Sequence, residues 1–230
     1  MKTQQKNAPV KAFKLILANN WPSLLLLLVG LALPLLIFGR LAYGVWGQKG
    51  GILWDESILL SIHETANPRL DLFAKTLTKF GLFWGVFPLA IVTMLVLFKQ
   101  RSWRSLAYWL ITILGSIVIN HTGKSVIHRV RPELWESPAP ESNYSFPSGH
   151  AMYTMTLVAA LVILTWESKW RWLALIVGGL FVLAIGWTRL YLGVHYPSDI
   201  VAGWMVSIAW AIGVGLLIKL RPFQGKNSSG

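Results

Sequence analysis

Cysteine is absent from the sequence, which excludes both a disulfide framework and a thiolate metal site. Charge is scarce as well: Asp, Glu, Lys and Arg make up 13% of the 230 residues, whereas a soluble domain carries about 25%. Polar linkers between apolar segments are also lacking, so we expect a single domain that extends over residues 1–230.

Apolar residues make up 54% of the chain, and its mean hydropathy is +0.54. Apolar runs of about 18 residues or more are typical of membrane spans, because about 20 helical residues cross the hydrocarbon core. We predict an all-α fold, an integral membrane bundle of six transmembrane helices. The expected spans are about 21–41, 79–98, 104–122, 150–166, 171–190 and 199–219.

Residues 42–78 form the longest non-spanning segment in the first half of the chain. Apolar residues recur there at helical spacing in two groups, and Pro68 stands where a helix start signal belongs. We expect short amphipathic helices that lie in the membrane interface between the first two spans. An ordinary folded loop is the alternative.

Basic residues outnumber acidic ones by 21 to 9, which gives a net charge of +12. They stand at the ends of apolar runs and not along a solvated face, so we expect contact with anionic lipid and no nucleic-acid partner. The two shortest loops and both termini are basic and fall on one side of a six-span bundle. The positive-inside rule then predicts that both termini are cytoplasmic.

Three clusters of cations and imidazoles interrupt the apolar sequence. In a six-span bundle, the ends of spans three and five and the starts of spans four and six share one membrane face. We therefore expect the clusters to converge there, since ionisable groups close to hydrocarbon are typical of functional sites. The clusters are Lys124 to Arg131-Pro132, then Pro147-Ser148-Gly149-His150, and then Thr188-Arg189 with His195 and Asp199.

The spacing of the first and third clusters carries chemical information. Lys124 and Arg131 are seven residues apart, so we expect them to share a helical face until Pro132 ends the helix. His195 and Asp199 are four residues apart. A carboxylate at that spacing can bind one ring nitrogen and leave the other as nucleophile or base.

The second cluster resembles a helix start. Ser148 suits the N-cap of span four. The N–H groups of Gly149 and His150 would then be free at the positive end of a helix, which is an anion site in itself.

Each residue also has an ordinary explanation when taken alone. Lys124 and Arg189 suit snorkelling cations at span ends, and Asp199 suits the N-cap of span six. A zinc site built from His128, His150 and His195 is conceivable, although no two of them share ligand spacing on one helix.

Several other polar or aromatic residues are expected to lie outside the site. We find no partner in the sequence for His63, His121 or His128, and we expect the glutamates of the loop before span four to be solvated. For three aromatic residues of that loop we hold two expectations equally: they line the entry for a lipid tail, or they pack against the membrane interface. The glutamates are Glu133, Glu136 and Glu141, and the aromatic residues are Trp135, Tyr144 and Phe146.

The order Lys-x6-Arg-Pro, then Pro-Ser-Gly-His, then Arg-x5-His-x3-Asp resembles the type 2 phosphatidic acid phosphatase family, which also includes glucose-6-phosphatase and vanadium haloperoxidases. The motifs extend from residue 124 to residue 199. One position departs from the family pattern, because Thr188 stands where the family usually has serine.

The resemblance implies phosphoryl transfer through a phosphohistidine, without a metal or any other cofactor. His195 would be the nucleophile, Asp199 would orient it, and His150 would be the general acid and base. The phosphoryl oxygens would be bound by Lys124, Arg131, Ser148, Gly149 and Arg189. Three cations and a helix N-terminus can supply the charge stabilisation that metals often supply in such reactions.

These expectations combine into a lipid phosphate phosphatase of a bacterial plasma membrane, with its active site on the outer face and no obligatory protein partner. Phosphatidylglycerol phosphate is the preferred substrate, undecaprenyl diphosphate the second, and phosphatidic acid a further candidate. A lipid transporter or flippase is a more distant alternative, and the chain lacks the internal repeat that transporters show. A non-catalytic lipid-binding protein would need the cations but not two histidines and a carboxylate.

Overall fold

The computed structural model describes residues 25–46 and 52–220. Within these two ranges every regular element is helical and there is no β-strand. This confirms the all-α prediction. The beginning of the predicted first span lies outside the described residues.

A helix occupies each of the six apolar runs. The helix of the second run begins at Val86, seven residues later than the predicted start at residue 79. Four of these helices are long and apolar enough to cross a membrane, namely η2 with α2, α6, α8 and α9, whereas α5 and α7 are shorter apolar helices. The helices are η2 (Leu26–Ala32), α2 (Leu33–Val45), α5 (Val86–Lys99), α6 (Trp103–Ile127), α7 (Gly149–Leu164), α8 (Trp170–Tyr191) and α9 (Pro197–Leu217).

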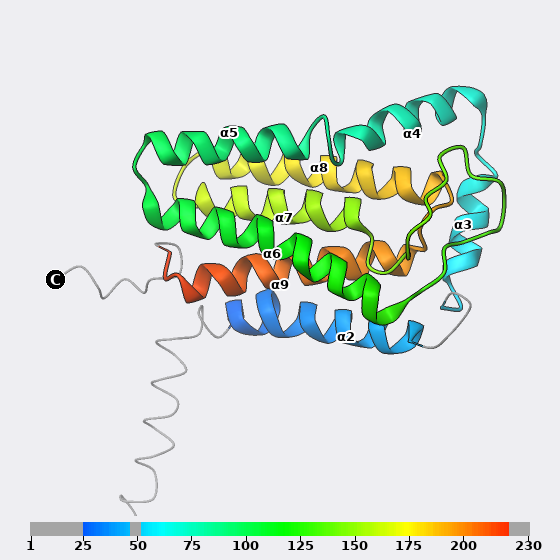
Figure 1. The fold of residues 1–230 in the computed structure, drawn as a ribbon, viewed down its shortest axis with the longest axis horizontal. Coiled ribbons are helices and arrows are strands. Elements are labelled where there is room, and N and C mark those ends of the chain that lie inside the picture. Colours follow the sequence, from blue (N-terminus) through cyan, green and yellow to red (C-terminus); the bar gives the residue numbers. More distant parts are fainter. Residues whose placement is uncertain (1–24, 47–51, 221–230) are drawn as a thin grey trace, which may run out of the picture.

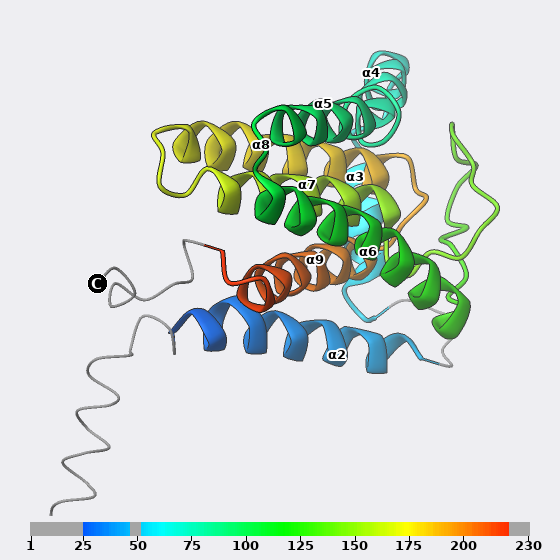
Figure 2. The same ribbon diagram turned by 60° about the vertical axis from the view of Figure 1, so that its left-hand side comes forward.

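The helix α7 lies at the centre of the bundle and packs against α6, α8 and α9 (Figure 1). On the outside, α2 runs along α9 and α5 lies on the opposite side (Figure 2). Small residues allow the central helices to approach closely. A Cβ atom on Gly203 of α9 would lie 3.1 Å from the Ser148 carbonyl oxygen, so this glycine permits the start of α7 to rest on α9.

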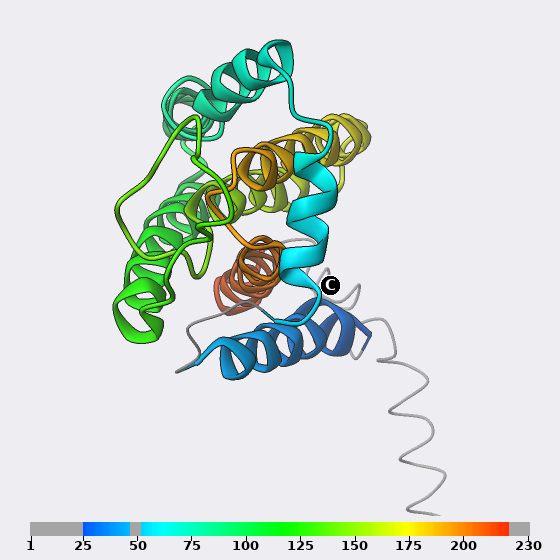
Figure 3. The same ribbon diagram turned by 90° about the vertical axis from the view of Figure 1, so that its right-hand side faces the viewer.

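The 42–78 segment forms α3 (Asp55–His63) and α4 (Pro68–Phe80). α3 crosses one end of the bundle (Figure 3) and contacts α8 and α9, whereas α4 packs along α8. The Asn67 side chain caps α4 by accepting hydrogen bonds from the N–H groups of Arg69 (3.2 Å) and Leu70 (3.0 Å). The prediction of two short helices here is correct.

The loop of residues 128–148 connects α6 to α7 at the same end of the bundle. α6 ends at Ile127, and His128 adopts a left-handed conformation with φ of 52°. The expectation that Lys124 and Arg131 share one helical face is therefore wrong. The left-handed residue turns the chain out of the helix before Arg131 is reached.

Candidate active site

The three sequence clusters adjoin at the end of the bundle where α6 and α8 finish and α7 and α9 begin (Figure 1). Two of the hydrogen bonds between these segments involve the backbone. The Ser148 N–H donates to the Asp199 carbonyl at 3.2 Å, and Arg131 Nη1 donates to the Val194 carbonyl at 2.5 Å. Residues that are far apart in the sequence thus surround one small region.

His195 is held between a carboxylate and a guanidinium group. Its Nδ1 lies 3.3 Å from Asp199 Oδ2, and its Nε2 lies 3.1 Å from Arg131 Nη1. Since a guanidinium can only donate, Nε2 is the acceptor and the ring proton belongs on Nδ1, facing the carboxylate. Burial, together with the positive charges of Arg131 and Arg189, lowers the pKa of His195 well below its usual value. The ring is therefore neutral at pH 7, with its Nε2 lone pair directed at a cation.

Asp199 occupies the first turn of α9 and is fully buried. Its Oδ2 also accepts a hydrogen bond from the Tyr196 N–H at 2.9 Å. Tyr196, and not Asp199, is the N-cap residue of α9, so the alternative explanation of Asp199 as an N-cap is wrong. Asp199 is the third residue of the helix, and its carboxylate accepts from the N-cap backbone. The backbone thereby fixes the oxygen that faces His195.

Two buried residues that the motifs do not include extend this arrangement. Arg129 donates from Nη1 to Asp199 Oδ1 at 2.5 Å and from Nη2 to Asp55 Oδ2 at 2.7 Å. The side chains of Arg129 and Asp55 are both buried. We predicted neither Asp55 nor Arg129 as part of the site. The signal that could have found them is the scarcity of charge, because a cation and a carboxylate near hydrocarbon require partners.

Arg131 and Arg189 are joined by Glu141. The carboxylate accepts a hydrogen bond from Arg131 Nη2 at 2.6 Å through Oε2, and it pairs with Arg189 Nη2 through Oε1. Burial alone would raise the pKa of Glu141, but the charges of Arg189 and Arg131 outweigh it and hold this pKa below its usual value. The expectation that Glu141 is solvated is therefore wrong, because the loop folds back over the two cations.

Lys124 reaches the same cluster from the last turns of α6. Its Nζ donates to Asn143 Oδ1 at 3.2 Å and to the Tyr144 carbonyl. Arg131 Nε donates to the Asn143 carbonyl at 2.7 Å. Lys124 and Arg131 are thus brought together by Asn143 and not by a common helical face.

Ser148 is the N-cap residue of α7, as predicted, but its hydroxyl makes no capping hydrogen bond. Ser148 Oγ is buried and has no hydrogen-bond partner among the described residues, so it is available to a ligand. Gly149 follows as the first residue of the helix. The Thr188 hydroxyl, in contrast, donates to the Ile185 carbonyl of its own helix at 2.7 Å.

The His150 ring lies against the end of α4. A Cβ atom on Gly81 would lie 3.0 Å from His150 Cδ2. One turn earlier, Thr78 Oγ1 accepts a hydrogen bond from Arg189 Nη1 at 2.7 Å. α4 therefore positions a predicted catalytic histidine and a predicted phosphate-binding cation. Among the described residues, no hydrogen bond joins the His150 ring to another predicted site residue.

Two other histidines have aromatic partners that we did not predict. The His63 ring stacks on Trp135 with centroids 4.0 Å apart, and the His128 ring meets Tyr144 edge-on at 4.5 Å. Phe146 is fully buried in the core and does not line an open passage. These contacts fasten the 128–148 loop over the site.

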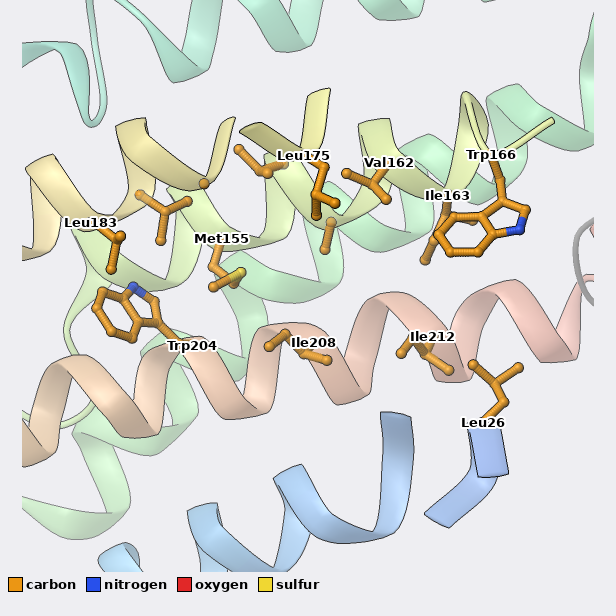
Figure 4. A pocket seen from close by; sticks show the side chains of 14 residues that line it. Leu26, Met155, Val162, Ile163, Trp166, Leu175, Leu183, Trp204, Ile208 and Ile212 are labelled. Atoms are coloured by element: carbon orange, nitrogen blue, oxygen red, sulfur yellow. The ribbon is translucent and has the colours of Figure 1, made fainter. Parts of the chain in front are cut away.

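A separate apolar cavity of about 700 Å³ lies between α7, α8 and α9. Figure 4 shows Trp204 and Leu183 at one end of it and Trp166 with Leu26 at the other. None of the predicted site residues lines this cavity.

The family model described as the PAP2 superfamily matches residues 104–221, which is just over half of the chain and includes all three motifs. The chain belongs to the PAP2 superfamily. This confirms the resemblance to type 2 phosphatidic acid phosphatases that the three motifs indicated.

Two relatives of this PAP2-superfamily chain align over different lengths. The undecaprenyl-diphosphatase of Sulfolobus acidocaldarius is 31% identical over 121 residues, which cover 50% of this chain and 56% of that protein. Phosphatidylglycerophosphatase B of Bacillus subtilis is 28% identical over 182 residues, which cover 75% of this chain and 84% of that protein.

A solved structure shares the fold of this PAP2-superfamily chain. The crystal structure of the first transmembrane PAP2 type phosphatidylglycerolphosphate phosphatase, from Bacillus subtilis, superposes with a TM-score of 0.72 at 25% identity. The superposition covers 84% of this chain and 98% of that one.

Proposed function

We propose that the protein is a membrane lipid phosphate phosphatase that works through a phosphohistidine on His195. The observation that supports this most directly is the pair of contacts at the His195 ring, with Asp199 at Nδ1 and Arg131 at Nε2. The ring is neutral, with its proton on Nδ1, and its Nε2 lone pair faces Arg131, the group that would bind a phosphoryl oxygen and release Nε2 for attack.

In the first step, the Nε2 lone pair forms a bond to phosphorus while the bond from phosphorus to the lipid oxygen breaks. His150 gives a proton to the departing alkoxide, and Asp199 stabilises the positive charge on the phosphorylated ring. In the second step, water attacks phosphorus, His150 takes a proton from it, and the N–P bond breaks to release inorganic phosphate and neutral His195.

Lys124, Arg131 and Arg189 bind the phosphoryl oxygens in this proposal, with the unpartnered Ser148 hydroxyl and the Gly149 N–H. Phosphoryl transfer is catalysed mainly by positioning and by stabilisation of charge on the equatorial oxygens. Three cations around one site can supply that stabilisation, so we propose that turnover requires no metal.

Phosphatidylglycerol phosphate is the substrate we favour, and undecaprenyl diphosphate is the second candidate, followed by phosphatidic acid. The Bacillus subtilis relative supports the first because its alignment covers 84% of that protein, whereas the Sulfolobus alignment covers 56% of its protein. The kcat/KM values of one preparation on the three lipids test this order. A higher value for undecaprenyl diphosphate would reverse it.

We propose that the whole chain is one domain with six membrane spans, both termini in the cytoplasm of a bacterium, and the site at the outer face. α3 and α4 would lie in the interface, because they expose large apolar side chains such as Ile58, Leu72 and Phe73. Since the chain has no cysteine, single cysteines report topology cleanly. An impermeant maleimide should label Glu136→Cys in intact spheroplasts, and Ser168→Cys only after permeabilisation.

The proposed activity is tested by phosphate release from detergent-solubilised protein in excess chelator. We expect release to continue, and we expect His195→Ala to lose both turnover and covalent labelling by a ³²P-labelled substrate. Dependence on an added metal would contradict the metal-free proposal, and a His195→Ala protein that still labels would contradict the nucleophile.

A further inference from the structure

Four ionisable side chains form an unbroken chain from α3 to the proposed nucleophile. Asp55 contacts Arg129 at 2.7 Å, Arg129 contacts Asp199 at 2.5 Å, and Asp199 contacts His195 at 3.3 Å. They come from α3, from the 128–148 loop and from the start of α9 with the residues just before it. All four side chains are at most 1% exposed.

The Asp55 carboxylate is bonded on both oxygens. Oδ1 accepts from the Ser198 N–H at 2.9 Å, and Oδ2 accepts from the Ser198 hydroxyl at 2.6 Å, from Arg129 and from the Ile52 N–H at 3.0 Å. A buried carboxylate with so many donors is held in one orientation. The Asp55 carboxylate also lies next to the start of α9, because Ser198 is in the first turn of that helix and directly precedes Asp199.

The Arg129 guanidinium is held by contacts on several sides. Its Nη1 is shared between Asp199 Oδ1 and Ser198 Oγ, the latter at 2.7 Å. Its guanidinium also lies over the Tyr196 ring, 4.1 Å from the centroid. Without Asp55, the second guanidinium nitrogen would lose its partner in a buried environment, and the cation would turn toward Asp199 or toward water.

We propose that Asp55 and Arg129 are positioning residues for phosphoryl transfer. Asp55 orients Arg129, Arg129 fixes the Asp199 carboxylate, and Asp199 fixes the His195 ring with Nε2 toward phosphorus. Neither Asp55 nor Arg129 touches the phosphoryl group. Two carboxylates share one guanidinium, so Asp199 is only partly neutralised and keeps the negative charge that stabilises a phosphorylated ring. This rests on the proposed function, and it gives α3 a role beyond covering the bundle.

A double-mutant cycle tests whether Asp55 acts through Asp199. In detergent, with dioctanoyl phosphatidylglycerol phosphate as the substrate, we expect Asp55→Asn to lower kcat by about 10- to 100-fold, by analogy with the loss found when the hydrogen-bond partner of a metal ligand is removed. KM should change by less than about twofold, since the phosphate-binding cations are untouched. In an Asp199→Asn background, the same change should cost less than about twofold. Equal effects in both backgrounds would overturn the proposal.

Asp71→Asn is the matched control. Asp71 is another carboxylate of the 42–78 segment, and it accepts a hydrogen bond from Tyr191 Oη at 2.8 Å outside the chain of four. We expect its substitution to leave kcat within about twofold. A loss of kcat as large as that of Asp55→Asn would indicate a merely structural effect of the segment and would overturn the proposal.

A spectroscopic measurement separates this proposal from the phosphatase activity. In protein labelled with ¹⁵N-histidine, with His195 assigned by its loss in His195→Gln, we expect Asp55→Asn but not Asp71→Asn to shift the Nδ1–H resonance. An unchanged resonance would overturn the positioning role even in an active enzyme. A shifted resonance in a protein that hydrolyses no lipid phosphate would support the positioning and overturn only the proposed function. If Asp55→Asn does not fold, Ser198→Ala removes only the hydroxyl between Asp55 and Arg129, and the same coupling and shift are expected.

Discussion

Glu141 Oε2 lies 2.6 Å from Arg131 Nη2. A carboxylate of the protein itself is thus bound to the guanidinium that we propose binds the phosphoryl group of the substrate. The other oxygen of Glu141 contacts Arg189 in the same way. A carboxylate and a phosphoryl group present similar oxygen acceptors to a guanidinium fork. A phosphoryl group that binds Nη2 of both arginines therefore competes with Glu141 for them.

We expect Glu141→Gln to bind phosphate more tightly, because the neutral amide competes less well for the two arginines. Taking about 1 kcal/mol for a partly exposed ion pair, KM for the lipid and the inhibition constant of inorganic phosphate should each fall by about fivefold. Glu136→Gln, in the same loop but exposed, should leave both constants unchanged. A rise in KM would mean that Glu141 holds the arginines in place for the substrate.

His150→Ala should lower kcat on the lipid substrate by about 10²-fold or more, the usual scale for loss of a general acid. Its first role is protonation of a poor alkoxide leaving group. An aryl phosphate, whose leaving group needs no proton, should therefore lose less rate in the phosphorylation step than the lipid does. His121→Ala, an exposed histidine of α6, is the control. Equal losses on both substrates would argue against proton donation.

Gly81→Ala should displace the His150 ring. The new Cβ would lie 3.0 Å from His150 Cδ2, 2.9 Å from Ile185 Cγ2 and 3.1 Å from the Thr78 carbonyl. These contacts leave no room for a methyl group, and a shift of about 1 Å in a catalytic group can cost about 10²-fold in rate. Gly39→Ala in α2, where the Cβ meets nothing within 4 Å, should be neutral. Full activity in Gly81→Ala would show that the His150 position tolerates this shift.

The stability of the protein should fall as the pH drops below about 6.5, through His195. Burial and the charges of Arg131 and Arg189 lower the pKa of His195 in the fold, so between that low value and 6.5 the unfolded chain binds a proton that the folded chain does not. Stability therefore rises with pH across this window. The pKa of Glu141 is also lowered, and its contribution is lost only below its ordinary value of 4.5.

The measurement is the Tm in detergent at pH 5.0 and 7.5. The drop in Tm between these values should be smaller in His195→Gln than in the unmodified protein, whereas His121→Gln should behave like the unmodified protein. An unchanged drop in His195→Gln would exclude His195 as the group responsible.

Much of the fold could be predicted because its signals are local. An apolar run of about 20 residues in a membrane forms a helix, because its backbone groups must pair within the segment. Asn67-Pro68 starts a helix through its own side-chain and ring chemistry. The i and i+4 spacing of His195 and Asp199 likewise indicated their contact, although the histidine precedes α9 and does not lie in it. Successive spans run in opposite directions across the bundle, so the positions of the motifs along the chain indicated which helix ends meet.

The pairing of the charges could not be predicted in this way. Arg129 and Arg131 are two residues apart, yet one pairs with Asp55 and Asp199 and the other with Glu141. Which carboxylate each guanidinium meets depends on the left-handed turn at His128 and on the path of a loop that has no periodicity. Periodicity along the chain indicates which side chains are buried. The partner of a charged side chain depends on how helices and loops that are far apart in the sequence pack together, so only the tertiary structure identifies it.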